Sequence, residues 1–282
     1  MVATPSPTVA VATAPSNSPQ PPSPAVTLEP DGAVFAPDPE LLFLLHDALG
    51  ESTASYGVYV KRLSDGRGAS VNPDQPFRAA SLFKLFVMWE AFRQQSVGLI
   101  DFEDTMDVTP YYKTFDLGTN AVEAGDRVTV GQALSLMMSI SDTPTGVLLQ
   151  NTLGFRTVNA ALEDLGIDNS GLFYPGDALA TARDAGVLLE VIARGETLPA
   201  ASHEAMIDLL LSAVADYGLK GGVPPETPVA HKTGSLATAL HDAGIVYAPG
   251  GAYVIVVLSD RQSADLIETI SRRVYEYYEA RD

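Results

Sequence analysis

The spacing of apolar residues predicts strands near both ends of the folded chain and helices between them. Apolar residues recur at helical intervals in several segments, which predicts helices over 39–50, 81–92, 130–140, 143–153, 155–165, 181–194, 202–214 and 263–280. Runs rich in β-branched and aromatic residues predict strands over 55–63, with a hairpin partner before Phe77, and over 228–234, 239–249 and 252–260. This order favours an α+β fold, in which both chain ends build one antiparallel sheet around an inserted helical block.

Residues 1 to about 37 lack any such periodicity. Ten of the 20 prolines lie in the first 40 residues, and no lysine or arginine precedes Lys61. A segment of Pro, Ser, Thr, Ala and Val buries too little apolar surface to offset its ordering entropy. We therefore predict a disordered, partly extended linker over 1–37 and one folded domain over 38–282.

The linker also bears on where the protein works. It lacks the basic start and apolar core of a secretory signal. Because Pro/Thr/Ser tethers often follow an export signal, we expect an extracytoplasmic protein. It would be secreted or tethered to the cell envelope, with an export signal that is not in this chain.

Charge and cysteine content exclude several classes of function. The chain has 17 Lys plus Arg against 35 Asp plus Glu, a net charge of −18. So acidic a protein is repelled by phosphate backbones and anionic lipid, and we expect no nucleic-acid partner. The absence of cysteine excludes thiol catalysis and disulfides. No apolar run reaches about 18 residues, so we expect no transmembrane span, and one core accounts for the apolar segments, which favours a monomer.

The first chemical motif opens the helix predicted over 81–92, which is apolar on nearly every side and is therefore expected to be buried. Ser81-Leu-Phe-Lys84 places a hydroxyl and an amine three residues apart, on one face of the helix. Burial lowers the pKa of a lysine, and a neutral amine can take the serine proton. The alternative is a capping serine followed by a lysine whose charge reaches solvent.

A second motif lies between two predicted helices. Ser141, Asp142 and Thr143 occupy a turn there, which could present the hydroxyl of Ser141 to a pocket. The alternative is an ordinary helix cap, because Ser, Asp and Thr are the usual capping residues.

The third motif ends a predicted strand. Lys232-Thr233-Gly234-Ser235 offers a cation and a hydroxyl for a substrate carboxylate, and a glycine that lets a ligand approach the backbone. The alternative is a polar strand end before a hairpin turn.

Taken together and in this order, the three motifs resemble the S-x-x-K, S-D-N and K-T-G motifs of the penicillin-recognising serine enzymes. The chain is most similar to the class A-like β-lactamases, since Ser141 follows Ser81 by 60 residues, about the separation in that group. The flanking sequences RAASLFKLFVMWEAF, GDRVTVGQALSLMMSISD and VAHKTG agree as well. The resemblance covers roughly residues 38–282 and implies the fold of that group.

The resemblance also implies roles for individual residues. Ser81 would be the acyl-accepting nucleophile and Lys84 its base, while Ser141 would pass a proton to the leaving lactam nitrogen. Lys232 would hold the substrate carboxylate and tune the proton on Ser141. The side chains of Thr233 and Thr143 would add contacts with the substrate. The backbone N–H groups of Ser81 and Ser235 would form an oxyanion hole. Tyr112, or its neighbour Tyr111, would form an aromatic wall of the cleft.

Several positions depart from the family pattern. Class A enzymes carry a loop glutamate that activates the water for deacylation, but the corresponding stretch 167–177 is shorter and has no glutamate. Asp168 lies nearest the expected place as a possible deacylation base, and Asp177 fits a loop-stabilising role. Thr143 replaces the usual asparagine. Strand 239–249 has no arginine for a substrate carboxylate, and Arg261 is the nearest candidate.

Acylation needs only groups that the sequence retains, whereas fast deacylation needs the missing glutamate. We therefore expect a serine hydrolase that opens β-lactam rings through a Ser81 acyl-enzyme and deacylates slowly. Two alternatives remain open: a D,D-peptidase or esterase of the same superfamily, and a non-catalytic penicillin-binding or sensor domain. This chemistry implies a small β-lactam or D-Ala-type peptide as ligand and no metal or organic cofactor.

Overall fold

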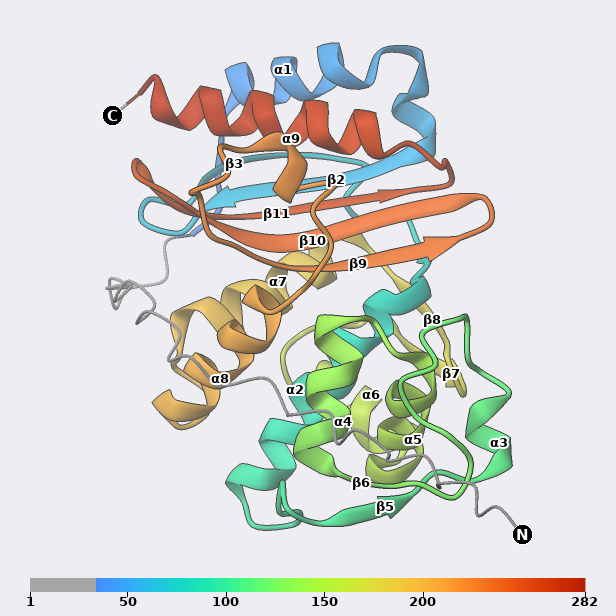
Figure 1. The fold of residues 1–282 in the computed structure, drawn as a ribbon. Coiled ribbons are helices and arrows are strands. Elements are labelled where there is room, and N and C mark those ends of the chain that lie inside the picture. The colour runs from blue at the N-terminus through green and yellow to red at the C-terminus, as the bar shows by residue number, and fades with distance from the viewer. Residues whose placement is uncertain (1–33, 282) are drawn as a thin grey trace, which may run out of the picture.

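A six-stranded sheet divides the molecule into two unequal layers of helices (Figure 1). The computed structural model describes residues 34–281. The sheet has the order β1-β3-β2-β11-β10-β9, and every neighbouring pair is antiparallel except β1 and β3. Its strands are β1 (Ala36–Pro37), β2 (Tyr56–Arg62), β3 (Arg67–Val71), β9 (Val229–Leu236), β10 (Ala239–Ala248) and β11 (Gly251–Ser259).

Helices cover both faces of this sheet, which explains why its central strands are buried along most of their length. Every residue of β2 is buried, and β11 is buried from Tyr253 to Ser259. The helices α1 (Pro39–Leu49) and α9 (Ala264–Glu279) lie on one face, and α7 (Ala182–Arg194) packs on the other. A strand covered on both sides reads as a continuous apolar run instead of an alternating one.

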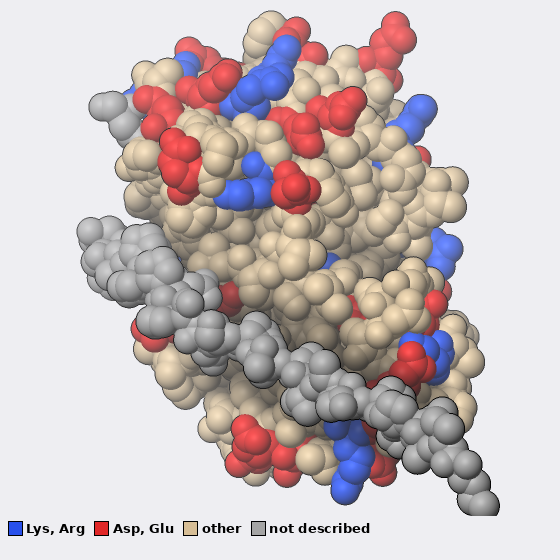
Figure 2. All heavy atoms as spheres, viewed as in Figure 1, with Lys and Arg blue, Asp and Glu red and all other residues tan. Residues whose placement is uncertain are grey.

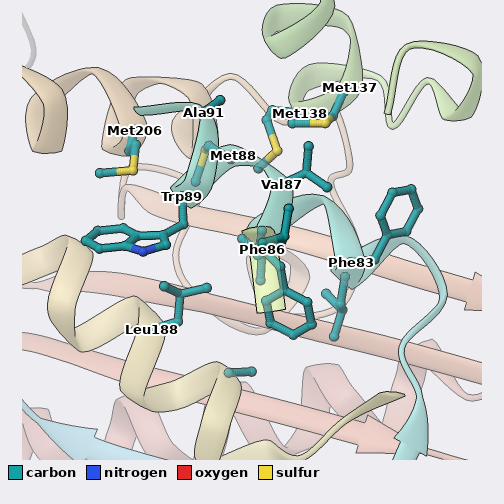
Figure 3. Close-up of a cluster of buried hydrophobic side chains, with 14 of the residues drawn as sticks. Phe83, Phe86, Val87, Met88, Trp89, Ala91, Met137, Met138, Leu188 and Met206 are labelled. Carbon is teal, nitrogen blue, oxygen red and sulfur yellow. The ribbon is translucent and has the colours of Figure 1, made fainter. Parts of the chain in front are cut away.

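The larger layer is a block of helices built around α2 (Phe83–Ser96). This helix contacts α4 (Val130–Ser139), α5 (Thr143–Leu153), α6 (Phe155–Glu163) and α8 (Ala200–Leu211). Figure 3 shows side chains of α2 pointing in several directions into the core, among them Phe86 and Trp89. The sequence-based expectation of a buried central helix is confirmed.

Short elements complete the molecule. Two small sheets have the strand orders β4-β8-β7 and β5-β6. Their strands are β4 (Phe77–Arg78), β5 (Thr105–Asp107), β6 (Arg127–Thr129), β7 (Gly171–Tyr174) and β8 (Asp177–Ala180). The remaining helical pieces are η1 (Gly50–Ser55), η2 (Ala80–Leu82), α3 (Pro110–Lys113) and η3 (Lys220–Gly222).

The predicted α+β architecture is confirmed: both chain ends contribute strands to one sheet, and the helical block lies between them in sequence. The three-stranded sheet β4-β8-β7 was not expected. Strand β1 pairs with β3 just before the expected domain start at residue 38, and residues 1–33 of the predicted linker lie outside the described residues. Within 34–281, no helix combines the length and apolarity needed to cross a membrane.

Candidate active site

Ser81 lies in the turn that joins strand β4 to helix α2. The preceding residue, Ala80, has a φ of 48°, an unusual value for a residue with a side chain, and η2 begins there. No side-chain hydrogen bond caps η2 or α2, so the alternative of a simple capping serine does not describe this turn. The hydroxyl of Ser81 is half-buried and lies 3.2 Å from Lys84 Nζ.

Lys84 is fully buried at the centre of the site, with an exposed fraction of 0%. Its Nζ lies 2.5 Å from the carbonyl oxygen of Ser141 and 3.2 Å from the hydroxyl oxygens of Ser81, Ser141 and Thr143. Burial, together with the positive charge of Lys232, holds the pKa of Lys84 well below its usual value, although Asp142 opposes the shift. Burial therefore makes the neutral amine easier to reach for Lys84 than for a lysine in solvent.

A glycine on a neighbouring helix makes room for this lysine. A Cβ added at Gly146 would lie 3.0 Å from Lys84 Cε and 3.3 Å from the ring of Phe83. Helices α2 and α5 therefore approach closely at this point, which brings the first two motifs together.

Ser141 occupies a strained turn between α4 and α5. Its φ of 60° is in the left-handed region, which costs about 1–2 kcal/mol for a residue with a side chain. Asp142 caps α5 by accepting a hydrogen bond from Thr145 N at 2.9 Å. The helix-cap interpretation is thus right for Asp142, and it leaves the hydroxyl of Ser141 free to face the lysines.

Lys232 reaches the same hydroxyl from the sheet. Its Nζ donates to Ser141 Oγ at 2.9 Å and to Thr233 O at 2.8 Å. The side chain is 2% exposed, and burial lowers the pKa of Lys232 to about 8 although Asp242 opposes the shift. The hydroxyl of Ser141 therefore lies between two amines.

A buried ion pair supports the Lys232 strand. His231 Nδ1 lies 2.9 Å from Asp242 Oδ1 on the adjacent strand, and Asp242 Oδ2 accepts from Leu219 N at 2.8 Å. Burial opposes the charged imidazole, but the carboxylate of Asp242 outweighs it and raises the pKa of His231. This pair links strands β9 and β10 to the segment that follows α8.

His241 anchors the turn of the nucleophile to the sheet. Its Nε2 lies 2.8 Å from Arg78 O, and its Nδ1 accepts from Ser259 N at 3.0 Å, which assigns the proton to Nε2. Burial lowers the pKa of His241, so the ring stays neutral. Its partners lie far from it in the chain, so the sequence alone does not identify them.

The K-T-G strand runs close to the nucleophile turn. A Cβ at Gly234 would lie 3.0 Å from Ala79 O, so only glycine fits without a shift. Ser235 is exposed at the end of β9, and its hydroxyl accepts from Gln262 Nε2 at 3.1 Å. The backbone of Ser235 therefore lies on the strand that borders Ser81, where an oxyanion hole would need it.

Among residues 34–281, no hydrogen bond or ion pair joins the other expected residues to this group. Asp168 is exposed between α6 and β7, and within residues 34–281 its side chain has no hydrogen bond or ion pair with the site. Tyr112 is half-buried, with its ring centroid 5.3 Å from that of Tyr111. Arg261 donates to Ser55 Oγ at 3.3 Å. Asp177 pairs with Arg78 at 3.3 Å, as a loop-stabilising residue would.

Charged side chains are unevenly distributed over the face seen in Figure 2. Figure 2 shows acidic and basic side chains over α1 and α9 at one end of this face and near β5 and β6 at the other, with a mainly uncharged band between. No group of three or more His, Asp or Glu side chains in the described part of the chain is placed to hold a metal ion.

An antiparallel sheet with an inserted helical block, and a serine-lysine pair facing a second serine and a second lysine, define the class of penicillin-recognising serine proteins. The model of the β-lactamase enzyme family matches residues 44–278. The chain therefore belongs to this family.

Similar proteins include curated and structurally solved members. A β-lactamase of Bacteroides uniformis is 26% identical over 53% of this chain, and the match spans 60% of that protein's length. β-lactamase VEB-1 of Pseudomonas aeruginosa is 22% identical over 84% of this chain and 90% of its own. The structure of PBP-A has a TM-score of 0.82 and 25% identity, covering 90% of this chain and 100% of that one.

Proposed function

We propose that this protein is a serine hydrolase that opens β-lactam rings through an acyl-enzyme on Ser81. One observation carries the proposal: Lys84 Nζ lies 3.2 Å from the hydroxyl of Ser81, and the hydroxyl of Ser141 lies within hydrogen-bond distance of both Lys84 and Lys232. This arrangement contains a nucleophile, a base and a path for its proton.

The proposed acylation is balanced within these groups. Lys84, in its neutral form, takes the proton from Ser81 Oγ as that oxygen bonds to the lactam carbonyl carbon. The carbon–nitrogen bond of the ring then breaks, and the proton passes from Lys84 through the hydroxyl of Ser141 to the lactam nitrogen. Lys84 ends neutral again, and Ser81 carries the acyl group as an ester.

Substrate binding is assigned to the end of strand β9. In its charged form, Lys232 attracts the carboxylate that β-lactams carry, and the half-buried Thr233 adds a hydroxyl beside it. The backbone N–H groups of Ser81 and Ser235 are proposed to stabilise the oxyanion.

The surroundings of Lys84 support slow deacylation. Its hydrogen-bond partners are two serines and a threonine, with no carboxylate among the described residues that bind it. Asp168 is exposed, and among residues 34–281 its carboxylate makes no hydrogen bond with Ser81. A general base must come within hydrogen-bond reach of the hydrolytic water, so the acyl ester is expected to persist.

Intact-protein mass spectrometry after mixing with benzylpenicillin tests this proposal. We expect an added mass equal to the whole antibiotic, which persists for minutes or longer. The variant Ser81→Ala is the control and should carry no adduct. Rapid nitrocefin turnover without a trapped adduct would overturn slow deacylation, and a wild-type chain that shows neither adduct nor turnover would overturn the hydrolase.

A D-Ala-D-Ala-type peptide is the second candidate substrate. The similarity to PBP-A over 100% of that chain favours it, and an engineered PBP-A variant was solved as an acyl-enzyme complex with penicillin G. Parallel assays of nitrocefin and a D-Ala-D-Ala peptide separate the two substrates. A third possibility, a non-catalytic sensor, requires that Ser81→Ala leave ligand binding unchanged and that the wild type form no covalent adduct. For all three, we propose an extracytoplasmic location.

A further inference from the structure

The loop between α3 and β6 is tied to the turn that carries Ser141. Thr119 Oγ1 on this loop donates a hydrogen bond to Asp142 Oδ1, across 23 positions of sequence. Asp142 has an exposed fraction of 0%. A buried carboxylate oxygen without a hydrogen-bond donor is costly in free energy. The hydroxyl of Thr119 therefore stabilises the buried carboxylate of Asp142, which belongs to a different segment of the chain.

The other oxygen of Asp142 is used by its own helix. Asp142 Oδ2 accepts from Thr145 N at 2.9 Å and from Thr145 Oγ1 at 2.8 Å. Because the cap occupies only Oδ2, the orientation of the carboxylate also depends on Thr119. Asp142 directly follows Ser141, whose φ is 60°. The hydrogen bond from Thr119 therefore helps to fix the strained backbone that presents the hydroxyl of Ser141.

Asp116 holds Thr119 in place. Asp116 Oδ1 accepts hydrogen bonds from Gly118 N at 2.8 Å and Thr119 N at 3.0 Å. It also lies 3.1 Å from Thr119 Oγ1, but a hydroxyl has a single proton, and the contact with Asp142 is shorter. The two backbone bonds thus position Thr119, and its hydroxyl remains for Asp142.

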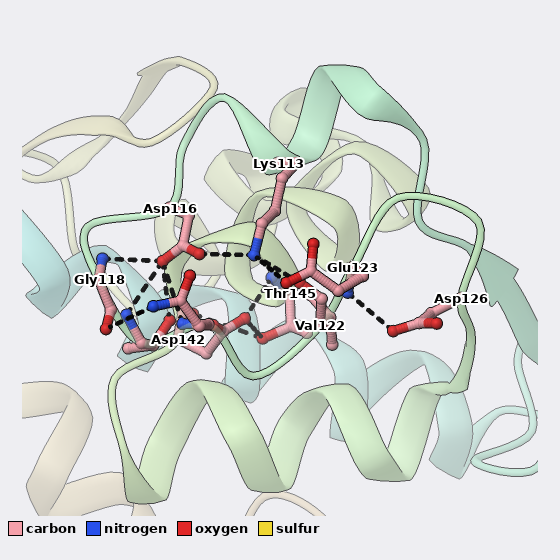
Figure 4. Close-up of polar contacts among 10 residues, drawn as sticks. Lys113, Asp116, Gly118, Val122, Glu123, Asp126, Asp142 and Thr145 are labelled. Atoms are coloured by element: carbon pink, nitrogen blue, oxygen red, sulfur yellow. Dashed lines mark hydrogen bonds and ion pairs between the residues drawn. The ribbon is translucent and has the colours of Figure 1, made fainter.

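Lys113 closes the loop (Figure 4). Its Nζ donates to Asp116 Oδ2 at 2.7 Å, to Val122 O at 2.8 Å and to Glu123 Oε1 at 3.1 Å, which uses all three of its N–H donors. The hydrogen bond from Lys113 lowers the pKa of Asp116, so this pair stays charged at neutral pH. Lys113 and Asp116 therefore fix the conformation of the loop over residues 114–126, which we call the strap. Thr119 connects the strap to the turn that carries Ser141.

The strap also reaches the base of the proposed reaction. The carboxylate of Asp142 opposes the lowering of the pKa of Lys84 that burial and Lys232 cause. Lys84 Nζ in turn binds Ser141 O at 2.5 Å. A displaced Asp142 would thus alter both the position of Ser141 and the charge that acts on Lys84.

We infer that Thr119 is a positioning residue for acyl transfer, which acts through Asp142 to hold the Ser141 hydroxyl between the two lysines. The inference rests on the proposed function, because the step affected is acylation of Ser81. Because Thr119 acts through Asp142 and not on the ligand, removing its hydroxyl should change the acylation rate constant and leave ligand affinity unchanged.

Three variants test this role with benzylpenicillin, by quenched-flow mass spectrometry over a range of concentrations. Thr119→Val removes the hydroxyl, and we expect the limiting acylation rate to fall at least tenfold, with the dissociation constant within twofold of the wild type. Thr119→Ser keeps the hydroxyl and should recover the rate to within threefold. Thr114→Val is the matched control and should stay within twofold, because within residues 34–281 the hydroxyl that it removes donates only to Tyr111 O, at 2.6 Å.

Equal acylation rates in Thr119→Val and Thr114→Val would overturn the inference, as would a failure of Thr119→Ser to recover the rate. If Thr119→Val does not fold by circular dichroism, Asp116→Asn replaces it, and an acylation rate unchanged from the wild type in that variant overturns the inference. A wild-type chain that never acylates overturns the proposed function instead, which distinguishes the two failures.

Discussion

At the scale of single residues, two buried lysines give this site its chemistry. Burial lowers the pKa of both Lys84 and Lys232. The carboxylate of Asp142 opposes this shift for Lys84, and that of Asp242 opposes it for Lys232. Their tasks need opposite states, because a base must be neutral and a carboxylate anchor must be charged. The acyl-transfer proposal therefore requires a neutral Lys84 and a charged Lys232 in the same site.

The pH dependence of acylation should reveal Lys232. Its pKa of about 8 means that the charged form is lost as pH rises through that value. We expect the second-order acylation rate with benzylpenicillin to fall above about pH 8. In Lys232→Arg, which keeps its charge across this range, the alkaline decrease should shift upward whatever the absolute rate. Identical alkaline limbs in the two proteins, both shown to be folded at pH 10, would contradict the assignment.

At the scale of elements, close approaches position the site. Gly234 lets β9 pass the turn of Ser81, and Gly146 lets α5 pass Lys84. A third glycine allows a close approach between a helix and the sheet. Helix α7 lies against β2 at Gly186, where an added Cβ would lie 2.4 Å from the ring of Tyr59. Side chains that must fit this closely leave little freedom in how the elements pack.

Replacing Gly186 should therefore destabilise the fold. Gly186→Ala forces α7 and β2 apart, and we expect a loss of about 1–3 kcal/mol in the free energy of unfolding, measured with urea. Gly131→Ala in α4 is the control, because its added Cβ meets nothing closer than 3.3 Å. Equal stability of the two variants would show that the packing at Tyr59 adjusts freely.

At the scale of the whole molecule, the active site depends on contacts between distant parts of the chain. Lys232 and Ser141 are 91 positions apart, and His241 and Arg78 are 163 apart. The buried pair of His231 and Asp242 joins the sheet to the segment after α8. Global stability and site geometry are thus linked.

Stability should depend on pH through His231. Its pKa is raised by Asp242 above the usual 6.5, so its contribution is fully present below about pH 6.5 and is lost as pH rises through the raised value. We expect His231→Gln to lower the free energy of unfolding by roughly 1 kcal/mol or more at pH 6 and by less at pH 9. A difference from wild type that is the same at both pH values would contradict a charged His231.

Much of the fold could be read from periodicity, because long elements repeat their apolar spacing. The prediction for 143–153 coincides with α5, and the strand predicted over 239–249 corresponds to β10. The three-stranded sheet β4-β8-β7 was missed, since two-residue and four-residue strands are too short to repeat a pattern. The helix expected over 202–214 runs instead from Ala200 to Leu211, with Pro199 at its N-cap.

The sequence by itself determined the kinds of groups available: Ser81 and Lys84 one helical turn apart, Ser141 in a turn, and Lys232 at a strand end. Residue identity and short spacing suffice for that, because local geometry follows from the backbone. Only the tertiary structure decided that both amines meet one hydroxyl, that burial lowers their pKa values, and that Thr119 binds Asp142. Single hydrogen bonds between distant residues and the loss of solvent leave no periodic trace in a chain, so they arise only when the elements pack.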